Sequence, residues 1–350
     1  MDNGQKPPRR IRYKGTHPKT FGEKYKEHRP ELYPADVQKV MQKGNTPAGM
    51  HRSICVQEIL DCLRVAPGQT GLDATLGYGG HSLELLQRIA PGGRLFAVDV
   101  DPYELPRTRD RLAALGYGPG ILEIRKMNFS GIDQLAGETG GFDFVLADLG
   151  VSSMQIDNPE RGFSLKVDGP LDLRLNPASG KSAAILLASL SQQKLTELLQ
   201  SNADEPHAEI IAGNIAAVLK AGSPVDTTFR LKNIIAASLD FLPQQARKEE
   251  VRKCCQRCFQ ALRIEVNDEF GALEKFLGRL PDALKPGGRA AILSFHSGED
   301  RRVKKAFQLY FREGIFSEMA MEPVRPSAKE VSGNPRARSA KLRWAVKAPR

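Results

Sequence analysis

The chain has 350 residues, of which 41% are hydrophobic and 26% are charged, a composition typical of a globular protein with room for about two domains. Lysine and arginine outnumber aspartate and glutamate by 51 to 41, and the formal net charge of +10 favours a polyanionic partner, most often nucleic acid. No apolar run is long enough to cross a bilayer and no N-terminal signal sequence is present, which excludes a membrane partner and predicts a soluble, cytoplasmic protein.

The five cysteines do not form a disulfide framework. They are Cys55, Cys62, Cys254, Cys255 and Cys258, and an odd, clustered set cannot pair completely. The last three fall in a helical pattern without a matching pair of cysteines or histidines nearby. We therefore expect buried or half-buried thiols and no metal site.

Residues 1–50 are predicted to form a basic, proline-rich arm with weak hydrophobic periodicity. Tyr13, Tyr25 and Tyr33 lie among its basic residues, a mixture suited to phosphate contacts and base stacking. A solvated tail without a partner is the alternative, and the sequence leaves both interpretations open. After the arm, residues 51–60 are predicted to open a helix.

A glycine-rich turn follows at residues 73–82 (Asp-Ala-Thr-Leu-Gly-Tyr-Gly-Gly-His-Ser). Residues 71–75 are predicted to form a buried strand before it, and residues 82–89 a helix that opens on a Ser82 cap. Glycine has no Cβ and accepts positive φ, so a ligand can lie directly on such a turn, beside the free amides of the helix N-terminus. The spacing differs from the dinucleotide-binding and phosphate-binding glycine motifs. An ordinary tight turn is the alternative to a cofactor cradle.

The second predicted strand, residues 94–98, is followed by Asp99, eighteen residues after His81. In doubly wound folds, an acid about 20 residues after the glycine turn binds a pair of ribose hydroxyls. An acid after each of the first two strands, with a glycine turn between them, fits S-adenosylmethionine better than NAD. The spaced acid makes the ordinary turn the less favoured interpretation.

Strands and helices alternate from residue 71 to residue 150, with further strands expected at residues 121–125 and 143–148. The connections are long enough for helices, which predicts an α/β fold with a doubly wound, Rossmann-like parallel sheet. The carboxyl ends of its strands should line the ligand crevice. Phe129 follows the third strand and is expected either to pack on an adenine face or to belong to the core.

The fourth predicted strand ends at Asp148 and leads into a polar loop that contains Ser152, Ser153 and Gln155. An acid at this strand end faces the same crevice, and the long aperiodic loop that follows is of the kind usually kept for function. Residues 179–250 then read as helices without strands. Two further strands are expected later in the chain, within residues 286–296 and at residues 341–346.

Several separate motifs occur in one order within residues 51–347. Besides the glycine turn they are residues 148–153 (Asp-Leu-Gly-Val-Ser-Ser), 161–164 (Arg-Gly-Phe-Ser), 168–172 (Asp-Gly-Pro-Leu-Asp), 259–264 (Phe-Gln-Ala-Leu-Arg-Ile), 294–297 (Ser-Phe-His-Ser), 299–301 (Glu-Asp-Arg) and 334–339 (Asn-Pro-Arg-Ala-Arg-Ser). With these motifs the chain resembles the bacterial MraW family, the ribosomal RNA small subunit methyltransferases H that methylate N4 of a cytidine.

The resemblance implies a class I methyltransferase domain in residues 51–155 and 256–350, interrupted by a helical substrate-recognition domain in residues 156–255. It implies S-adenosylmethionine as the cofactor and small-subunit ribosomal RNA as the substrate. The cofactor-binding residues that it implies are Gly79, Gly80 and His81 for the methionine end, Asp99 for the ribose, Phe129 for the adenine, and Asp148 and Gln155 for the rest of the site.

Methyl transfer to a cytosine amine needs positioning and an acceptor for the amine proton. The amine is a poor nucleophile because its lone pair is delocalised into the ring. Asp148 is the expected catalytic residue, since a carboxylate that accepts a hydrogen bond from the amine favours charge localisation. The hydroxyls of Ser152 and Ser153 are the other candidates and are expected to contact the substrate, which must leave its stack to reach the site.

Three residues late in the chain are candidate RNA contacts. His296 follows the fifth predicted strand at the crevice, where it contacts RNA or orients the loop of Glu299 and Asp300. Arg336 and Arg338 belong to a basic stretch that either binds phosphates or is a solvated edge strand.

Other functions remain open on the sequence. A divergent paralogue would methylate another RNA site, and a protein that kept the fold without catalysis would only bind RNA. A methyltransferase for a small molecule or a protein is disfavoured by the net positive charge and the basic arm. The sequence also leaves open which cytidine is used, whether the substrate is free RNA or a small-subunit particle, and whether the protein is a monomer or a homodimer.

The basic arm can be tested by deleting residues 1–30. The deletion should flatten the salt dependence of RNA binding, because each lysine or arginine that neutralises a phosphate releases counterions. Filter binding of small-subunit RNA at several salt concentrations measures this slope, while the affinity for S-adenosylmethionine should stay unchanged. An equal slope in the full-length and shortened proteins would identify the arm as a solvated tail.

Overall fold

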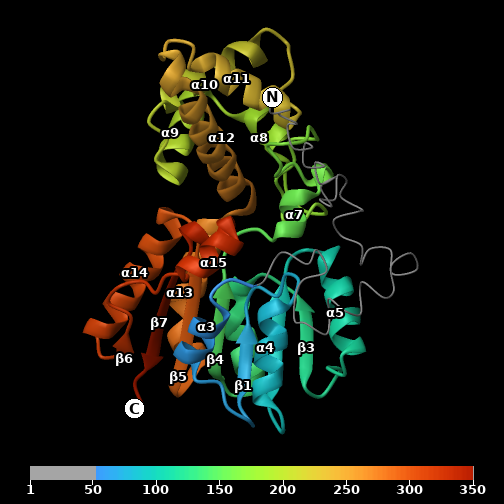
Figure 1. The fold of residues 1–350 in the computed structure, drawn as a ribbon, viewed down its shortest axis with the longest axis vertical. Coiled ribbons are helices and arrows are strands. Elements are labelled where there is room, and N and C mark those ends of the chain that lie inside the picture. The colour runs from blue at the N-terminus through green and yellow to red at the C-terminus, as the bar shows by residue number, and fades with distance from the viewer. Residues whose placement is uncertain (1–52, 350) are drawn as a thin grey trace, which may run out of the picture. The chain divides into compact units, whose positions relative to one another are not determined.

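The computed structural model describes residues 53–349 of the chain (Figure 1). The basic arm predicted at residues 1–50 and the predicted helix start at His51 lie outside the described residues. The first described helix, α3 (Val56–Leu63), begins after Cys55, whose backbone is left-handed with φ of 56°. Within the described range, no helix is both long enough and apolar enough to cross a membrane.

The described strands form one seven-stranded sheet with the order β3-β2-β1-β4-β5-β7-β6. Their bounds are β1 Thr70–Asp73, β2 Arg94–Asp99, β3 Leu122–Lys126, β4 Phe142–Asp148, β5 Leu284–Ser294, β6 Phe316–Met319 and β7 Lys341–Lys347. The first five strands pair in parallel, whereas β7 is antiparallel to β5 and to β6. The predicted Rossmann-like α/β fold is confirmed, and the strand order reverses between β1 and β4, where such sheets bind their ligands.

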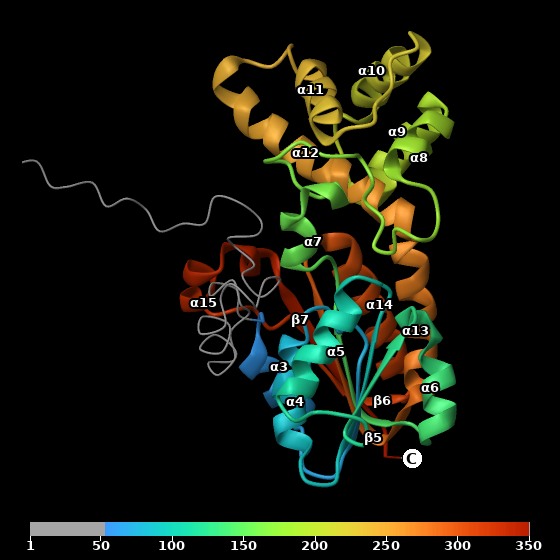
Figure 2. The ribbon, with the colours of Figure 1, turned by 90° about the vertical axis from the view of Figure 1, so that its right-hand side faces the viewer.

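Helices cover both faces of the sheet (Figure 2). One face carries α3, α4 (Gly80–Ile89) and α5 (Glu104–Ala114), and the other carries α6 (Ile132–Thr139), α13 (Glu269–Ala283) and α14 (Ser297–Arg312). Successive residues of β4 divide between the two layers, with Phe144 and Leu146 in the first core and Val145 and Ala147 in the second. Burial on both faces explains why these strands are continuous apolar runs in the sequence.

The residues between β4 and α13 form a helical region with its own apolar core. Its helices are α7 (Ser153–Asp157), α8 (Ala183–Ser189), α9 (Gln192–Ala203), α10 (Ala208–Lys220), α11 (Thr228–Ser238) and α12 (Gln244–Asn267). Their core includes the buried thiols of Cys254, Cys255 and Cys258. Helix α12 runs through residue 255 without a break, so no helix end marks the predicted boundary there, and the division into domains stays a prediction.

Four short elements complete the described chain: η2 Phe129–Gly131, η3 Pro159–Arg161, α15 Ala328–Gly333 and η4 Pro335–Ser339. The predicted Ser82 cap is wrong, because α4 begins at Gly80 and the Ser82 hydroxyl donates instead to Asp73 Oδ2 (2.6 Å). Strand β6 has no counterpart among the predicted strands. Its four residues are buried, exposed, exposed and buried in turn, so they lack the alternation that identifies a strand.

Gly71 of β1 lies directly opposite Phe144 of β4. A Cβ built on Gly71 would lie 2.0 Å from Cζ of the Phe144 ring. The ring therefore occupies the space that any side chain at this position would need. In contrast, a Cβ on Gly278, on the exposed side of α13, would meet nothing within 4 Å.

The two glycines predict opposite effects of the same substitution. Gly71→Ala should lower the free energy of unfolding by about 1–3 kcal/mol, because an overpacked core forces side chains and backbone to move. Gly278→Ala is the matched control and should raise it by about 0.5–1 kcal/mol, because alanine favours a helix interior over glycine. Urea unfolding followed by circular dichroism measures both, and a Gly71→Ala protein as stable as wild type would contradict the close packing of β1 on β4.

Candidate active site

Three neighbouring parallel strands each end on an aspartate. Asp99 ends β2, Asp73 ends β1 and Asp148 ends β4, and the strands stand in that order in the sheet. Because the strands are parallel, the three carboxyl groups share one edge of the sheet. The sequence predicts the ligand crevice at this edge, which lies where the strand order reverses.

The glycine turn between β1 and α4 lies against this edge. Gly77 and Gly79 have positive φ values of 48° and 75°, and the Thr108 hydroxyl of α5 holds the turn by donating to the Gly77 carbonyl (2.8 Å). A Cβ on Gly79 would lie 2.9 Å from the Thr108 methyl group. No side chain of the described residues caps the start of α4, so its positively polarised end can face a negatively charged ligand group.

Asp99 is held by two backbone amides. The Gly77 N–H donates to Oδ2 (2.7 Å) and the Asp101 N–H donates to Oδ1 (2.9 Å). Burial raises the pKa of Asp99 above its ordinary value, although these amides oppose that effect. Each oxygen still has a second lone pair for an incoming hydroxyl, so the carboxylate is fixed in place and able to bind a pair of ribose hydroxyls.

The two oxygens of Asp148 differ in their surroundings. Oδ2 lies 3.4 Å from Nδ1 of His81, whereas Oδ1 is buried and has no hydrogen-bond partner among the described residues. The backbone N–H of Asp148 donates to the Thr75 hydroxyl (2.6 Å), which fixes the strand end. A buried acceptor without a partner costs free energy, so Oδ1 is suited to a donor from a ligand.

His81, near the start of α4, is buried and has both ring nitrogens near protein atoms. Its Nε2 lies 3.0 Å from the Ile54 carbonyl and its Nδ1 faces Asp148. Burial by itself would lower the pKa of His81, but the hydrogen bond and charge of Asp148, together with the charge of Asp73, raise it above the ordinary value. The imidazolium form is thus favoured at this position.

Gln155 is buried, and both ends of its side-chain amide are used by the protein. Its Oε1 accepts from the Ser152 N–H (2.9 Å), in a capping box that starts α7, and its Nε2 donates to Asp101 Oδ2 (2.8 Å). Ser152 is the N-cap of that helix, and its hydroxyl accepts from the Gln155 N–H. Gln155 therefore has a structural role: it contacts Asp101, which lies two positions after Asp99 and donates its N–H to that residue.

Asp101 and Arg161 are parts of the site that sequence reasoning missed. The buried Arg161 guanidinium donates to Asp101 Oδ2 (2.8 Å) and to the carbonyls of Arg174 (3.1 Å) and Leu175 (2.9 Å). It thereby connects the end of β2 to the long loop after β4. The Arg-Gly-Phe-Ser motif at residues 161–164 includes Arg161, but it does not predict the partner of that arginine. The hydrogen bond between Arg161 and Asp101 joins residues sixty positions apart in the chain.

The other predicted site residues lie in or next to three further elements, η2, α14 and α7. Phe129, in η2, packs edge-on against Phe276 with ring centroids 5.2 Å apart and is half-buried at the margin of the core. His296, after β5, caps α14, and its Nε2 lies 3.2 Å from Glu299 Oε1. Ser153 is half-buried in the first turn of α7.

The two arginines proposed for phosphate contacts differ in their exposure to solvent. Arg336 is half-buried and donates to Asp157 Oδ1 (3.1 Å), which ties η4 to the end of α7. Arg338 is exposed in the same short element. Arg338 is therefore the more available of the two for a phosphate group.

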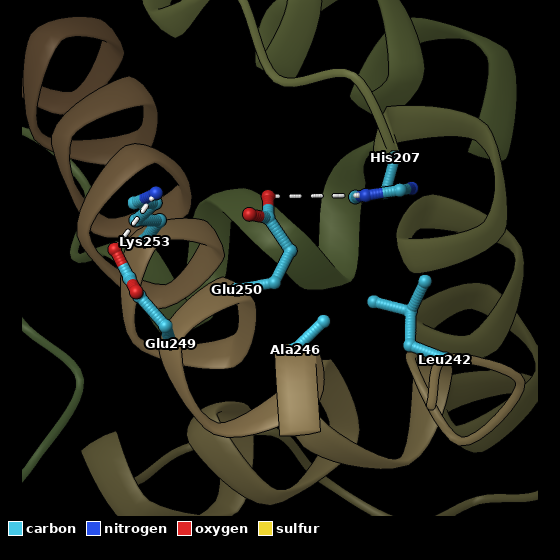
Figure 3. A pocket seen from close by; sticks show the side chains of 6 residues that line it. All are labelled: His207, Leu242, Ala246, Glu249, Glu250 and Lys253. Carbon is cyan, nitrogen blue, oxygen red and sulfur yellow. Dashed lines mark ion pairs between the residues drawn. The ribbon is translucent and has the colours of Figure 1, made fainter. Parts of the chain in front are cut away.

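A shallow pocket of about 380 Å³ lies in the helical region and contains none of the three strand-end aspartates (Figure 3). It is lined by His207, Leu242, Ala246, Glu249, Glu250 and Lys253.

Cys254 lies close to Glu250, but the Arg257 Nη2 donates to Glu250 (2.7 Å) and also contacts the Cys254 thiol (3.1 Å). Desolvation, assisted by the charge of Glu205, raises the pKa of Cys254 to about 12. A guanidinium thus already neutralises the acidic groups that a cation would need.

Comparison with known proteins identifies close relatives over nearly the whole chain. The model of the MraW methylase family matches residues 48–348. A protein of Alkaliphilus metalliredigens named ribosomal RNA small subunit methyltransferase H 2 is 62% identical over 349 residues, which cover 99% of this chain and 100% of that protein. Ribosomal RNA small subunit methyltransferase H 1 of Lachnoclostridium phytofermentans is 58% identical over 97% of this chain and 93% of its own length. The H protein of Halorhodospira halophila is 40% identical over 85% of this chain and 94% of its own length.

The geometry of Asp99 predicts the effect of Asp99→Asn on the binding of S-adenosylmethionine, the cofactor expected from the sequence. The substitution keeps the shape but removes the charge and one of the two acceptors. The free energy of cofactor binding should become less favourable by about 1–3 kcal/mol, the contribution of hydrogen bonds to a charged group. Isothermal titration calorimetry measures it.

Asp143→Asn is the matched control for this measurement. Asp143 is at the other end of the parallel strands, where it accepts from the Thr70 N–H and from Lys285, so its substitution should leave cofactor affinity unchanged. If Asp99→Asn folds normally and binds the cofactor as tightly as wild type, Asp99 does not hold the ribose.

Proposed function

Because the chain belongs to the MraW methylase family, we propose that it transfers a methyl group from S-adenosylmethionine to N4 of a cytidine in small-subunit ribosomal RNA. The names of its relatives support the RNA substrate. The observation that carries the amine chemistry is Oδ1 of Asp148 at the sheet edge, which is buried and has no hydrogen-bond partner among residues 53–349. An amine is a donor of the kind that this oxygen lacks.

The residues at the sheet edge fit the cofactor. The uncapped start of α4 suits the carboxylate of its methionine part, since free amides and the helix dipole favour a negative group. Asp99 offers one free lone pair on each oxygen to a ribose hydroxyl pair. Phe129 is proposed to lie beside the adenine, with its ring held in a T-shaped arrangement against Phe276. Gln155 is proposed to support the site through Asp101.

When bound, S-adenosylmethionine supplies a methyl group already activated by a sulfonium, so the protein must orient the amine and accept the proton that the amine releases. Asp148 Oδ1 accepts a hydrogen bond from the amine, which favours localisation of the nitrogen lone pair. After transfer it takes the amine proton and passes it to water. The carboxylate is thus restored for the next turnover.

The substrate contacts are proposed on the same side of the protein. The target cytidine must be unstacked to reach Asp148. Ser152 and Ser153 follow Asp148 on the loop and are proposed to contact the base. His296 is proposed at the neighbouring strand end, and Arg336 and Arg338 are proposed to contact phosphates.

Asp148→Asn tests the proposed chemistry most directly. The amide keeps the shape but loses the negative charge and one acceptor, so turnover should fall by about 10²–10⁴-fold, the usual contribution of a general base. Transfer of tritium from labelled S-adenosylmethionine to small-subunit RNA measures the rate. Naked RNA and assembled small-subunit particles should be compared, because the preferred substrate form is part of the proposal.

Asp133→Asn serves as the control for removal of a surface carboxylate. Asp133 pairs with Arg279 on the outer surface (2.8 Å), and its substitution should leave turnover unchanged. Full activity in Asp148→Asn would move the proton acceptor to Ser152, Ser153 or water and would refute the role given to Asp148.

A further inference from the structure

The environment of the His81 ring fixes the position of one of its protons. Nε2 lies 3.0 Å from the carbonyl oxygen of Ile54, and a carbonyl can only accept a hydrogen bond. Nε2 must therefore carry the hydrogen. The Ile54 carbonyl is itself held in place, because Cys55 has a left-handed backbone and its N–H donates to Glu330 Oε1 of α15 (2.9 Å).

The other ring nitrogen faces a carboxylate. Nδ1 lies 3.4 Å from Asp148 Oδ2, and a lone pair on Nδ1 would repel that oxygen. A proton between these two atoms removes the repulsion. Since Nε2 already carries a hydrogen, a proton on Nδ1 makes the ring an imidazolium and the contact an ion pair.

The charges around the ring favour this form. Asp148 faces the ring from β4 and Asp73 acts on it from β1, whereas the Cys55 thiol nearby stays neutral because burial raises its pKa to about 12. Asp73 is occupied by the Ser82 hydroxyl (2.6 Å) and the Thr75 N–H (3.1 Å). Asp148 is thus the carboxylate that makes direct contact with the ring.

We propose that His81 is a positioning residue for Asp148, whose Oδ2 it holds through a doubly protonated ring so that Oδ1 is left to meet the target amine. This inference rests on the role proposed for Asp148 in methyl transfer. In this proposal the His81 side chain helps to position the substrate amine, through Asp148, and does not bind the cofactor. Both ring nitrogens are engaged by the protein, so any contribution of His81 to cofactor binding comes from its backbone amide at the start of α4.

The pairing is tested by nuclear magnetic resonance of the histidine rings in the full-length protein, without cofactor or RNA. The chain has six histidines, and the His81 signal is the one lost in His81→Asn. In wild type, the His81 ring should titrate above the ordinary pKa of about 6.5. In Asp148→Asn the ring pKa should fall, because a neutral amide no longer favours the imidazolium.

His207 provides the internal control. Its Nε2 lies 3.8 Å from Glu250 Oε1 in the pocket of Figure 3, and its ring signals should be the same in Asp148→Asn as in wild type. Glu250→Gln should change the His207 ring signals and leave those of His81 unaltered. A His81 ring with the same pKa in Asp148→Asn and wild type, or one that stays neutral below pH 6.5, overturns the inference.

A second measurement separates positioning from a merely structural role. In wild type, kcat should fall as the pH rises through the His81 pKa, because the deprotonated Nδ1 then repels Oδ2. His81→Asn offers an amide donor that does not titrate, so it should lack this fall while its KM for RNA stays unchanged. Identical pH profiles in the two proteins would overturn the positioning role.

The experiments distinguish a failure of the role proposed for Asp148 in methyl transfer from a failure of its pairing with His81. Methyl transfer unaffected by Asp148→Asn would refute the proposed function of Asp148, whereas a lowered ring pKa in the same variant would still support its pairing with His81. An unchanged ring pKa overturns the pairing and has no bearing on whether the protein methylates RNA.

Discussion

The six residues from Gly77 to Ser82 are the segment on which the whole crevice depends, because each of the three strand-end aspartates contacts it. The Gly77 amide binds Asp99, the Ser82 hydroxyl binds Asp73 and the His81 ring faces Asp148. The segment can make all three contacts because Gly77 and Gly79 adopt positive φ and turn the chain directly into α4. One turn therefore orders three carboxyl groups that belong to three different strands.

Concentrating these acids has an electrostatic cost. Burial raises the pKa of both Asp73 and Asp99, so their ionised forms disfavour the folded state as the pH rises above the ordinary carboxyl range. Backbone amides, a hydroxyl and an imidazolium offset part of that cost. The oxygen left without such help, Asp148 Oδ1, is the one that we assign to the substrate amine. The free-energy cost of an unpaired buried acceptor thus remains at the oxygen that a donor from the substrate can reach.

The sequence predicts the parts of this site that depend on local pattern. Apolar runs ending in an acid locate Asp99 and Asp148, and the parallel arrangement of the strands then brings them to one edge. The sequence does not predict which side chains pair with one another. The contacts of His81 with Ile54 and Asp148, and of Asp101 with Gln155 and Arg161, join residues far apart in the chain. No periodicity or spacing encodes such pairings, and the β6 strand is too short to give a signal.

Mass spectrometry of nucleosides identifies the product of the reaction and so tests the proposed methylation of N4 of a cytidine. Unmodified small-subunit RNA is incubated with the purified protein and S-adenosylmethionine, then digested to nucleosides and compared with standards. The proposed function predicts one new methylated nucleoside, N4-methylcytidine. A methyl group found instead on a ring carbon, on a ribose oxygen or on protein would contradict it.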